Sequence, residues 1–215
     1  MSRVGYIVLI VAVTVVLLSC RGRPSATPSY SVTPGMLSTG SLLLLDSSSA
    51  VHHHITKIAT GCPITHVGMV VHDASHEPFI LHTTAARGAC VEHLPTWLAR
   101  MGSRTRVLAR VYDGEVSGVD AQAAFAPWLS APYTFDLWKA VVLNRMGVEM
   151  PTVDAHTSDG LFCSQLIALV LSSLGIVDFS TRGLSPRLVL PVHFLDTRLP
   201  FRALARVALP SVRAH

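Results

Sequence analysis

The feature that most constrains the fold is an apolar run in the last third of the chain. Residues 161–174 are apolar at most positions, and Gly175 follows them directly. Glycine is favoured just past the end of a helix because it adopts the left-handed conformation that closes the last turn. The run therefore predicts a helix that ends at Gly175 and carries Cys163 at its N-terminus.

Short apolar segments upstream of this helix have the pattern of β-strands. Residues 65–72 and 79–84 flank a turn at 73–78, which predicts an antiparallel hairpin. Further strands are expected over 41–46, 90–93, 106–112 and 201–208, and helices over 51–60, 94–101, 119–129 and, wholly or in part, 133–145. Strands and helices in this order predict an α+β domain.

A second apolar run, residues 4–18, lies at the start of the chain between Arg3 and the basic pair Arg21 and Arg23. A membrane-spanning helix usually needs about 20 apolar residues, so the run has marginal length. Three interpretations stay open: a hydrophobic signal-anchor helix, a lipoprotein signal acylated at Cys20, and a cleaved signal peptide.

These observations predict three parts of the chain. Residues 1–23 are the signal-anchor or lipoprotein signal, residues 24–39 a linker rich in Ser, Thr and Pro, and residues 40–215 the folded domain. The membrane is the expected partner of the N-terminal segment, and the protein is expected to be membrane-anchored or a lipoprotein. The side of the membrane stays open, because basic residues after the run favour a cytoplasmic domain whereas a lipoprotein would carry it outside.

Charge and cysteine usage exclude two classes of function. The net charge is +4 and the basic residues are scattered, which is too diffuse for a nucleic-acid surface. The cysteines Cys20, Cys62, Cys90 and Cys163 match neither a zinc spacing nor a small disulfide scaffold, although a single Cys62–Cys90 bridge stays open. The run 52–54 of three histidines fits a surface loop better than a metal site, so no metal and no cofactor are expected.

Cys163 is the candidate nucleophile. A cysteine attacks as the thiolate, and a helix N-terminus favours that negative charge, so its pKa is expected to be lowered. The backbone amides of Cys163 and Ser164 would also suit an oxyanion. The alternative is a buried structural cysteine.

Two histidines on the predicted hairpin are candidate partners of this thiol. His66 begins the first strand, where a period of two predicts that His66, Gly68 and Val70 face inward. The small Gly68 would let His66 approach a helix terminus closely. His82 on the adjacent strand could accept a ring proton from His66 and fix its tautomer. The alternative is that both are polar residues of the core.

Five segments in order resemble the permuted NlpC/p60 family of papain-like enzymes, found in bacteria and poxviruses and related to lecithin retinol acyltransferase. The segments are 64–70, 79–82, 91–98, 132–135 and 162–167. The histidine strand precedes the cysteine helix, as in that family. The resemblance implies a circularly permuted papain-like α+β domain, in which an antiparallel sheet packs on the nucleophile helix.

The resemblance also implies roles for individual residues. Cys163 is similar to the family nucleophile, His66 to the general base and His82 to the third polar residue, where bacterial members often have glutamate. Tyr133 and Ser164 are the expected substrate-binding residues. The chain departs from the family at Gly40-Ser41, where Gly-Asp is common, and at Ser164-Gln165, where Ser-Glu is common.

The expected function is that of a thiol hydrolase that works through an acyl-enzyme. Its substrate would be a peptide or cell-wall amide, or a lipid ester with hydrolysis or acyl transfer, and a membrane tether would favour lipids by raising their effective concentration. One alternative is a membrane-anchored binding module that keeps the fold without turnover. Another is a metal-binding protein that uses the histidine run.

Overall fold

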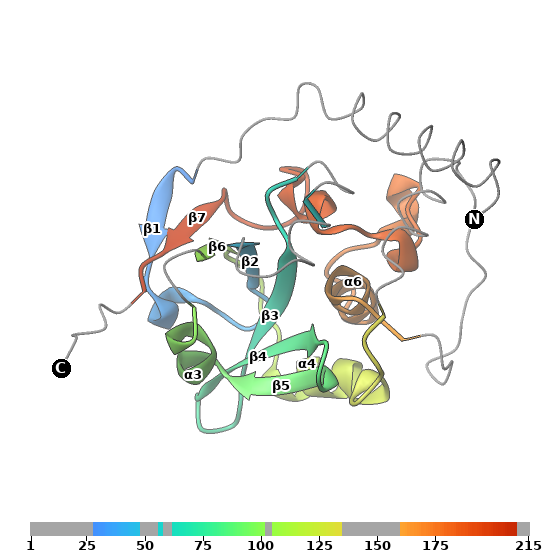
Figure 1. Cartoon of the computed structure of the whole chain (residues 1–215), viewed down its shortest axis with the longest axis horizontal. Helices are drawn as coiled ribbons and strands as arrows, with labels where there is room; N and C mark the ends of the chain where they lie inside the picture. The colour runs from blue at the N-terminus through green and yellow to red at the C-terminus, as the bar shows by residue number, and fades with distance from the viewer. Residues whose placement is uncertain (1–27, 48–55, 58–61, 102–104, 135–159, 210–215) are drawn as a thin grey trace, which may run out of the picture.

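The computed structural model describes residues 28–47, 56–57, 62–101, 105–134 and 160–209. These residues form a mixed α+β architecture around one seven-stranded sheet with the order β1-β7-β6-β2-β3-β4-β5 (Figure 1). The strands are β1 (Tyr30–Val32), β2 (Leu42–Ser47), β3 (His66–His72), β4 (Pro78–Thr84), β5 (Gly88–His93), β6 (Thr105–Arg110) and β7 (Ala205–Val207).

The helices lie mostly on the two faces of this sheet. They are α3 (Leu94–Ala99), α4 (Gly118–Phe125) and α6 (Cys163–Ser173), with short 3-10 helices η1 (Pro34–Met36), η2 (Ala126–Trp128), η3 (Ser180–Arg182), η4 (Pro186–Leu188) and η5 (Pro191–Leu195). The apolar helix expected to end at Gly175 is confirmed as α6, and Cys163 is its first residue.

The predicted hairpin is confirmed. Strands β3 and β4 pair antiparallel from Met69↔Leu81 to His72↔Pro78. Strand β5 continues the antiparallel order along β4 from Phe79↔His93 to Thr84↔Gly88. Strands β2 and β6 lie on the other side of β3, and each was predicted within one or two residues of its observed bounds.

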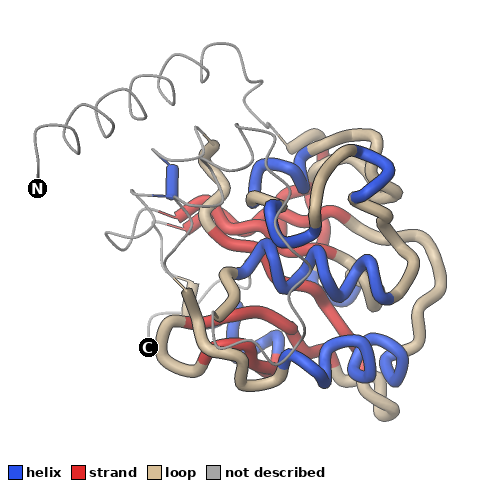
Figure 2. The backbone as a smooth tube through the Cα atoms, turned by 90° about the vertical axis from the view of Figure 1, so that its right-hand side faces the viewer, coloured by secondary structure: helices blue, strands red, loops and turns tan. Residues whose placement is uncertain are grey.

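The sheet separates two apolar clusters. On one face, Val67, Met69 and Leu81 pack with residues of α6. On the other, Val70 and Ile80 pack with residues of α3. Figure 2 shows α6 lying along its face of the sheet. This arrangement corrects one expectation: His66, Gly68 and Val70 alternate onto the α3 face, not toward the nucleophile helix.

Gly68 is therefore small for a different reason from the one expected. A Cβ atom at this position would lie 2.6 Å from Cδ1 of Ile80 on the neighbouring strand. That distance is shorter than van der Waals contact. The absence of a side chain at Gly68 leaves space for the Ile80 side chain on the neighbouring strand and does not bring β3 closer to α6.

The N-terminal edge of the sheet corrects the predicted linker. Strand β1 pairs in parallel with β7, from Tyr30↔Ala205 to Val32↔Val207. The folded domain thus includes residues 30–39, and the sheet is mixed and not wholly antiparallel as expected. A strand of three residues is too short to give a periodic signal in the sequence, so its pairing depends on the distant C-terminal segment.

A buried arginine holds that C-terminal segment against β6. Arg110 is 2% exposed, and its guanidinium donates hydrogen bonds to the carbonyl oxygens of Phe194, Asp196, Phe201 and Arg202. Burial lowers the pKa of Arg110, although the charge of Asp196 opposes this shift. One side chain thus satisfies carbonyl groups of an irregular segment that has few regular backbone partners.

Some expectations concern residues outside the described ranges. They include the N-terminal segment 1–23, the histidine run 52–54 and most of the expected helix over 133–145. Within the ranges that the structure does describe, no helix is both long enough and apolar enough to cross a membrane.

Replacing the buried guanidinium tests how much this anchor stabilises the fold. Arg110→Met keeps an unbranched apolar side chain but leaves buried carbonyl oxygens without donors, so we expect unfolding to become easier by roughly 3 kcal/mol or more. Urea denaturation would measure the loss. The matched variant Arg206→Met, at an exposed arginine of β7, should change stability by less than about 0.5 kcal/mol. Similar losses in both variants would contradict the anchoring role of Arg110.

Candidate active site

Cys163 stands at the N-terminus of α6 with its side chain 4% exposed. Three backbone amides, those of Val67, Ser164 and Cys163 itself, donate hydrogen bonds to its sulfur. Amides at a helix N-terminus favour a negative sulfur. Burial outweighs them, however, and raises the pKa of the Cys163 thiol to about 11.

This result overturns the expectation of a lowered pKa. Position along a helix is visible in the sequence, whereas the loss of solvent around the sulfur is not. Desolvation penalises the charged form of a thiol, and the sulfur here is enclosed by the core around α6. At neutral pH Cys163 is therefore a thiol whose proton must be removed before or during any attack.

The sulfur lies where two strands part. The ladder between β3 and β4 begins at Met69↔Leu81, so the amide of Val67 precedes the first pair. That amide donates to the sulfur of Cys163 instead. The thiol at position 163 is thus held against the backbone of the residue that directly follows His66.

The structure brings the two predicted histidines together. Nε2 of His66 lies 3.1 Å from Nδ1 of His82, within hydrogen-bond distance. The ring centroids are 5.4 Å apart and the ring planes are nearly perpendicular, at 89°. This edge-on contact lets a nitrogen of one ring point at a nitrogen of the other.

A glutamate that sequence analysis assigned no role completes the series. Nε2 of His82 lies 2.9 Å from Oε1 of Glu92. The carboxylate also forms ion pairs with Arg87 and Arg100. Although burial opposes it, these hydrogen bonds and charges lower the pKa of Glu92, so the group is ionised at neutral pH.

The register between strands β4 and β5 is the feature that could have identified Glu92 as a partner of His82. Strands β4 and β5 pair His82 with Cys90 and Ile80 with Glu92. Glu92 is therefore a diagonal neighbour of His82 on the same face of the sheet, a position from which long side chains reach each other.

The carboxylate fixes the direction of the hydrogen bonds in this series. An ionised carboxylate only accepts, so Nε2 of His82 carries a hydrogen. A neutral His82 then accepts at Nδ1 from the Nε2–H of His66. A neutral His66 with its hydrogen on Nε2 has its basic lone pair on Nδ1.

His82 is kept neutral by its surroundings. It is buried, and its ring meets that of Trp97 on α3 edge to face, with centroids 5.8 Å apart. Burial lowers the pKa of His82 to about 4, although Glu92 opposes this shift. At neutral pH an uncharged His82 therefore donates a hydrogen bond to Glu92 from one ring nitrogen and accepts one from His66 at the other.

Tyr133 lies close enough to the sulfur of Cys163 for the two groups to interact electrostatically. It forms a parallel bridge with Leu161, a residue that precedes the start of α6 by two positions. Tyr133 therefore lies beside the N-terminus of this helix. Burial and the neighbouring Cys163 sulfur both raise the pKa of Tyr133, so its hydroxyl stays protonated. Its role toward a substrate stays a prediction.

The Ser164 side chain has a structural contact in place of the expected substrate contact. It is fully buried, and its hydroxyl donates to the carbonyl oxygen of Val189 at 2.7 Å. The backbone amide, not the hydroxyl, is the part of Ser164 that meets the sulfur. A substrate role is therefore limited to that amide.

Gln165 explains a departure from the resembled family. Its amide oxygen accepts from the backbone N–H of Phe162 at 3.2 Å, and its amide nitrogen donates to the carbonyl oxygen of Arg187 at 2.5 Å. An ionised glutamate could accept but not donate. The glutamine therefore suits the contact between the start of α6 and the segment that follows η3.

His82, Cys90 and Glu92 are a group that could hold a metal ion, with ligand atoms all within 4.8 Å of one another. In the observed arrangement Arg87 and Arg100 pair with the carboxylate and supply its positive charge. A bound cation would have to displace them. Cys62, Cys90 and Cys163 are buried and form no disulfide with one another, so the Cys62–Cys90 bridge does not form.

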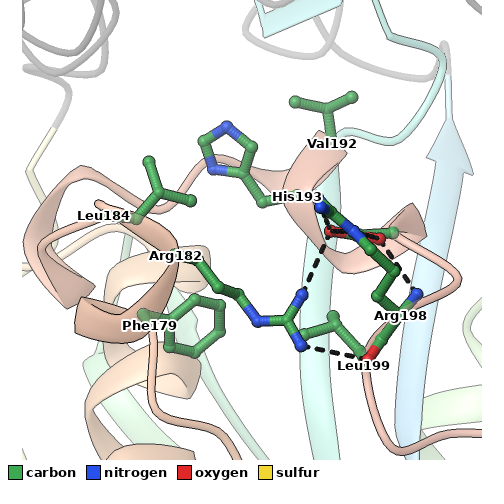
Figure 3. Close-up of a pocket in the computed structure, with 8 residues that line it drawn as sticks. Phe179, Arg182, Leu184, Val192, His193, Arg198 and Leu199 are labelled. Atoms are coloured by element: carbon green, nitrogen blue, oxygen red, sulfur yellow. Dashed lines mark hydrogen bonds and ion pairs between the residues drawn. The ribbon is translucent and has the colours of Figure 1, made fainter.

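A cavity of about 210 Å³ lies apart from these residues, in the segment that follows α6. It is lined by Phe179, Arg182, Leu184, Val192, His193, Asp196, Arg198 and Leu199. Arg182 and Arg198, both labelled in Figure 3, form ion pairs with the carboxylate of Asp196. Their charge is thus already paired, and none of the candidate catalytic side chains borders this cavity.

Comparisons with known proteins leave the family open. No family model matches the chain, and no curated protein matches it. Among solved structures, the chain is similar to the crystal structure of the metalloprotein YiiX from Escherichia coli O157:H7, with 17% identity and a TM-score of 0.47 over 80% of this chain and 89% of that chain. Similarity at this level establishes neither a fold family nor a function.

The buried His82 predicts sensitivity to acid. Its pKa is about 4 in the folded protein against an ordinary 6.5, so the folded state binds fewer protons than the unfolded chain between these values. Its contribution to stability is complete above pH 6.5 and is lost as the pH falls toward 4, by up to about 3 kcal/mol. Denaturation in urea at several pH values would measure this slope. His82→Gln should flatten it, whereas the exposed His93→Gln should retain it; an unchanged slope in His82→Gln would contradict the assignment.

Proposed function

We propose that the protein is a thiol hydrolase of permuted papain-like design, with Cys163 as nucleophile, His66 as general base, and His82 and Glu92 as the residues that orient this base. The observation that carries the proposal is the hydrogen-bond series from Glu92 through His82 to His66, which ends beside the residue whose amide holds the sulfur. A nucleophile, a base and an oriented partner are the parts that covalent catalysis requires.

The reaction would proceed in two steps. The His66 side chain starts on the α3 face and the sulfur of Cys163 lies on the α6 face, so the proposal requires the two to meet at the gap where β3 and β4 stop pairing. As the sulfur attacks the carbonyl carbon of an amide or ester there, the thiol proton would move to Nδ1 of His66, and the carbonyl π electrons would move to the oxygen. When the carbonyl re-forms, the leaving amine or alkoxide takes the proton from His66. Water then attacks the acyl-enzyme, gives a proton to His66 and releases the acid, and Cys163 regains its proton.

The raised pKa of Cys163 makes this base essential to the proposal. A thiol with a pKa of about 11 supplies little thiolate at neutral pH, so proton removal and attack must be coupled. His66 would become positively charged in that step. The neutral His82 and the ionised Glu92 behind it would stabilise this charge through the same hydrogen bonds that orient the ring.

Two substrate classes remain within the proposal: a peptide or cell-wall amide, and a lipid ester with hydrolysis or acyl transfer. Attachment to a membrane through residues 1–23, by a hydrophobic helix or by acylation of Cys20, is supported by the apolar run 4–18. Such attachment would favour the lipid class.

A second candidate function is an inert, membrane-anchored binding module with the same fold. The observation that favours it is the burial of Cys163, because a sulfur with 4% exposure and a raised pKa reacts slowly unless the surrounding residues admit a substrate. The two candidates differ in whether an acyl group is transferred to the sulfur.

The activated ester p-nitrophenyl acetate separates these candidates, because it is small and releases a coloured product on each acyl transfer. We expect acetylation of Cys163, detected by peptide mass spectrometry, followed by turnover. Cys163→Ser should abolish the reaction, and His66→Gln should slow it by about 100-fold or more, since it removes the base. His93→Gln, at an exposed histidine of β5, should leave the rate unchanged. A folded protein that never acylates Cys163 would support the inert module.

The polarity of the hydrogen-bond series can be reversed by one substitution. In Glu92→Gln, we expect Arg100, which contacts Oε2, to retain the amide oxygen, and the exposed Arg87 to move away from the NH₂ group that then replaces Oε1 beside His82. His82 would then accept at Nε2 and donate from Nδ1, and His66 would carry its hydrogen on the nitrogen meant to be basic. We expect acetylation to slow by about 100- to 10,000-fold in a protein that still folds.

The matched control for this substitution is Arg87→Gln, which removes a charge from the same carboxylate but leaves it able only to accept. We expect a loss much smaller than in Glu92→Gln. Nitrogen-15 chemical shifts of the two imidazoles would report the tautomers directly. Identical tautomers in the unmodified protein and in Glu92→Gln would rule out the orienting role of Glu92.

A further inference from the structure

The hydroxyl of Thr83 is a buried polar group that the proposed reaction has not yet used. Thr83 is 1% exposed, and its Oγ1 has no hydrogen-bond partner among the residues that the structure describes. An unpaired buried hydroxyl costs about 1–3 kcal/mol, and such groups are uncommon in folded proteins. An unpaired hydroxyl at this buried position of the sheet therefore suggests a function other than packing.

The register of the sheet locates this hydroxyl. The pairs Met69↔Leu81 and Val71↔Phe79 define the antiparallel alignment of β3 and β4. Two residues beyond the last pair, the same alignment sets Thr83 opposite Val67, where the ladder has ended. Val67 is the residue whose amide donates to the Cys163 sulfur. Thr83 thus stands on the opposite side of the gap that holds the sulfur.

The side chain of Thr83 also emerges on the face that carries the nucleophile. It alternates with His82, whose ring meets α3, and shares its direction with Leu81, which packs in the α6 cluster that includes Cys163. The residue opposite Thr83 on the neighbouring strand β5 is Ala89, which belongs to the same cluster. The backbone of Ala89 bonds to that of Ala131, close to Tyr133. Thr83, Cys163 and Tyr133 therefore border a common region.

We propose that Thr83 Oγ1–H is a side-chain donor of the oxyanion hole, and that it binds the carbonyl oxygen of the acyl group attacked by Cys163. This role rests on the proposed function. In the resting protein, amides of α6 and β3 already surround the sulfur, and the hydroxyl has no negative charge to meet. As the sulfur attacks, charge moves from sulfur to the carbonyl oxygen, which supplies the acceptor that Thr83 lacks.

The isosteric variant Thr83→Val distinguishes this role from simple packing. It keeps the volume and the β-branch and removes only the hydroxyl. Because that hydroxyl is unpaired in the resting protein, Thr83→Val should be at least as stable as the unmodified protein in urea denaturation. A loss of activity without a loss of stability would therefore be specific to catalysis. Thr83→Ser, which restores a hydroxyl, should recover most of the activity.

Two reagents acting on the same sulfur give the decisive comparison. Acetylation by p-nitrophenyl acetate develops negative charge on a carbonyl oxygen, whereas alkylation by iodoacetamide displaces iodide and develops none. We expect Thr83→Val to slow acetylation of Cys163 by about 100- to 1,000-fold, the usual effect of removing one oxyanion donor. Its alkylation rate, which reports the thiol and its base, should stay unchanged.

The outcomes separate the two proposals. Acetylation at the unmodified rate in Thr83→Val, or an equal loss in both reactions, would overturn the role of Thr83 and leave the thiol hydrolase proposal standing. If the unmodified protein is alkylated at Cys163 but never acetylated there, the proposed hydrolase function fails, and the role of Thr83 fails with it.

Discussion

The hydrogen bond from the amide of Val67 to the sulfur of Cys163 joins the two halves of the candidate site. One partner belongs to an early strand and the other to a helix almost a hundred residues later in the chain. The bond exists because β3 and β4 stop pairing before Val67, which leaves an amide directed at the space the sulfur enters. If the ladder continued by two more residue pairs, that amide would meet β4 and the helix would lose its point of contact.

The rest of the site follows from one acceptor on the other face of the sheet. Glu92 accepts from His82 and is balanced by two arginines. Because it cannot donate, it imposes one tautomer on each histidine in turn. The sheet therefore separates two environments: an apolar one around the sulfur, and a charged one near its edge that sets the direction of the hydrogen bonds between Glu92 and the two histidines.

Much of the fold could be predicted from the sequence because it depends on local patterns. The strands of the hairpin, the apolar helix and the order of histidine before cysteine are visible in runs of residues, and the contact of His66 with His82 followed from the hairpin. The pKa of Cys163 could not be predicted, because it depends on how many distant residues exclude water. Glu92 required the register of β5, and β1 required its C-terminal partner β7. The predicted facing of the His66 side chain was wrong. The alternation of side chains along a strand assigns residues to two faces, but it does not say which face the nucleophile helix covers.

The position of β1 near the start of the chain limits how far the folded domain could lie from a membrane anchor. Strand β1 begins at Tyr30, so a chain held in a bilayer up to Arg23 has only seven peptide links before the folded unit. Fully extended, these links reach at most about 25 Å. If residues 1–23 anchor the chain in a membrane, β1 would therefore lie within about 25 Å of the bilayer surface, and no long spacer would separate the folded domain from the lipid headgroups.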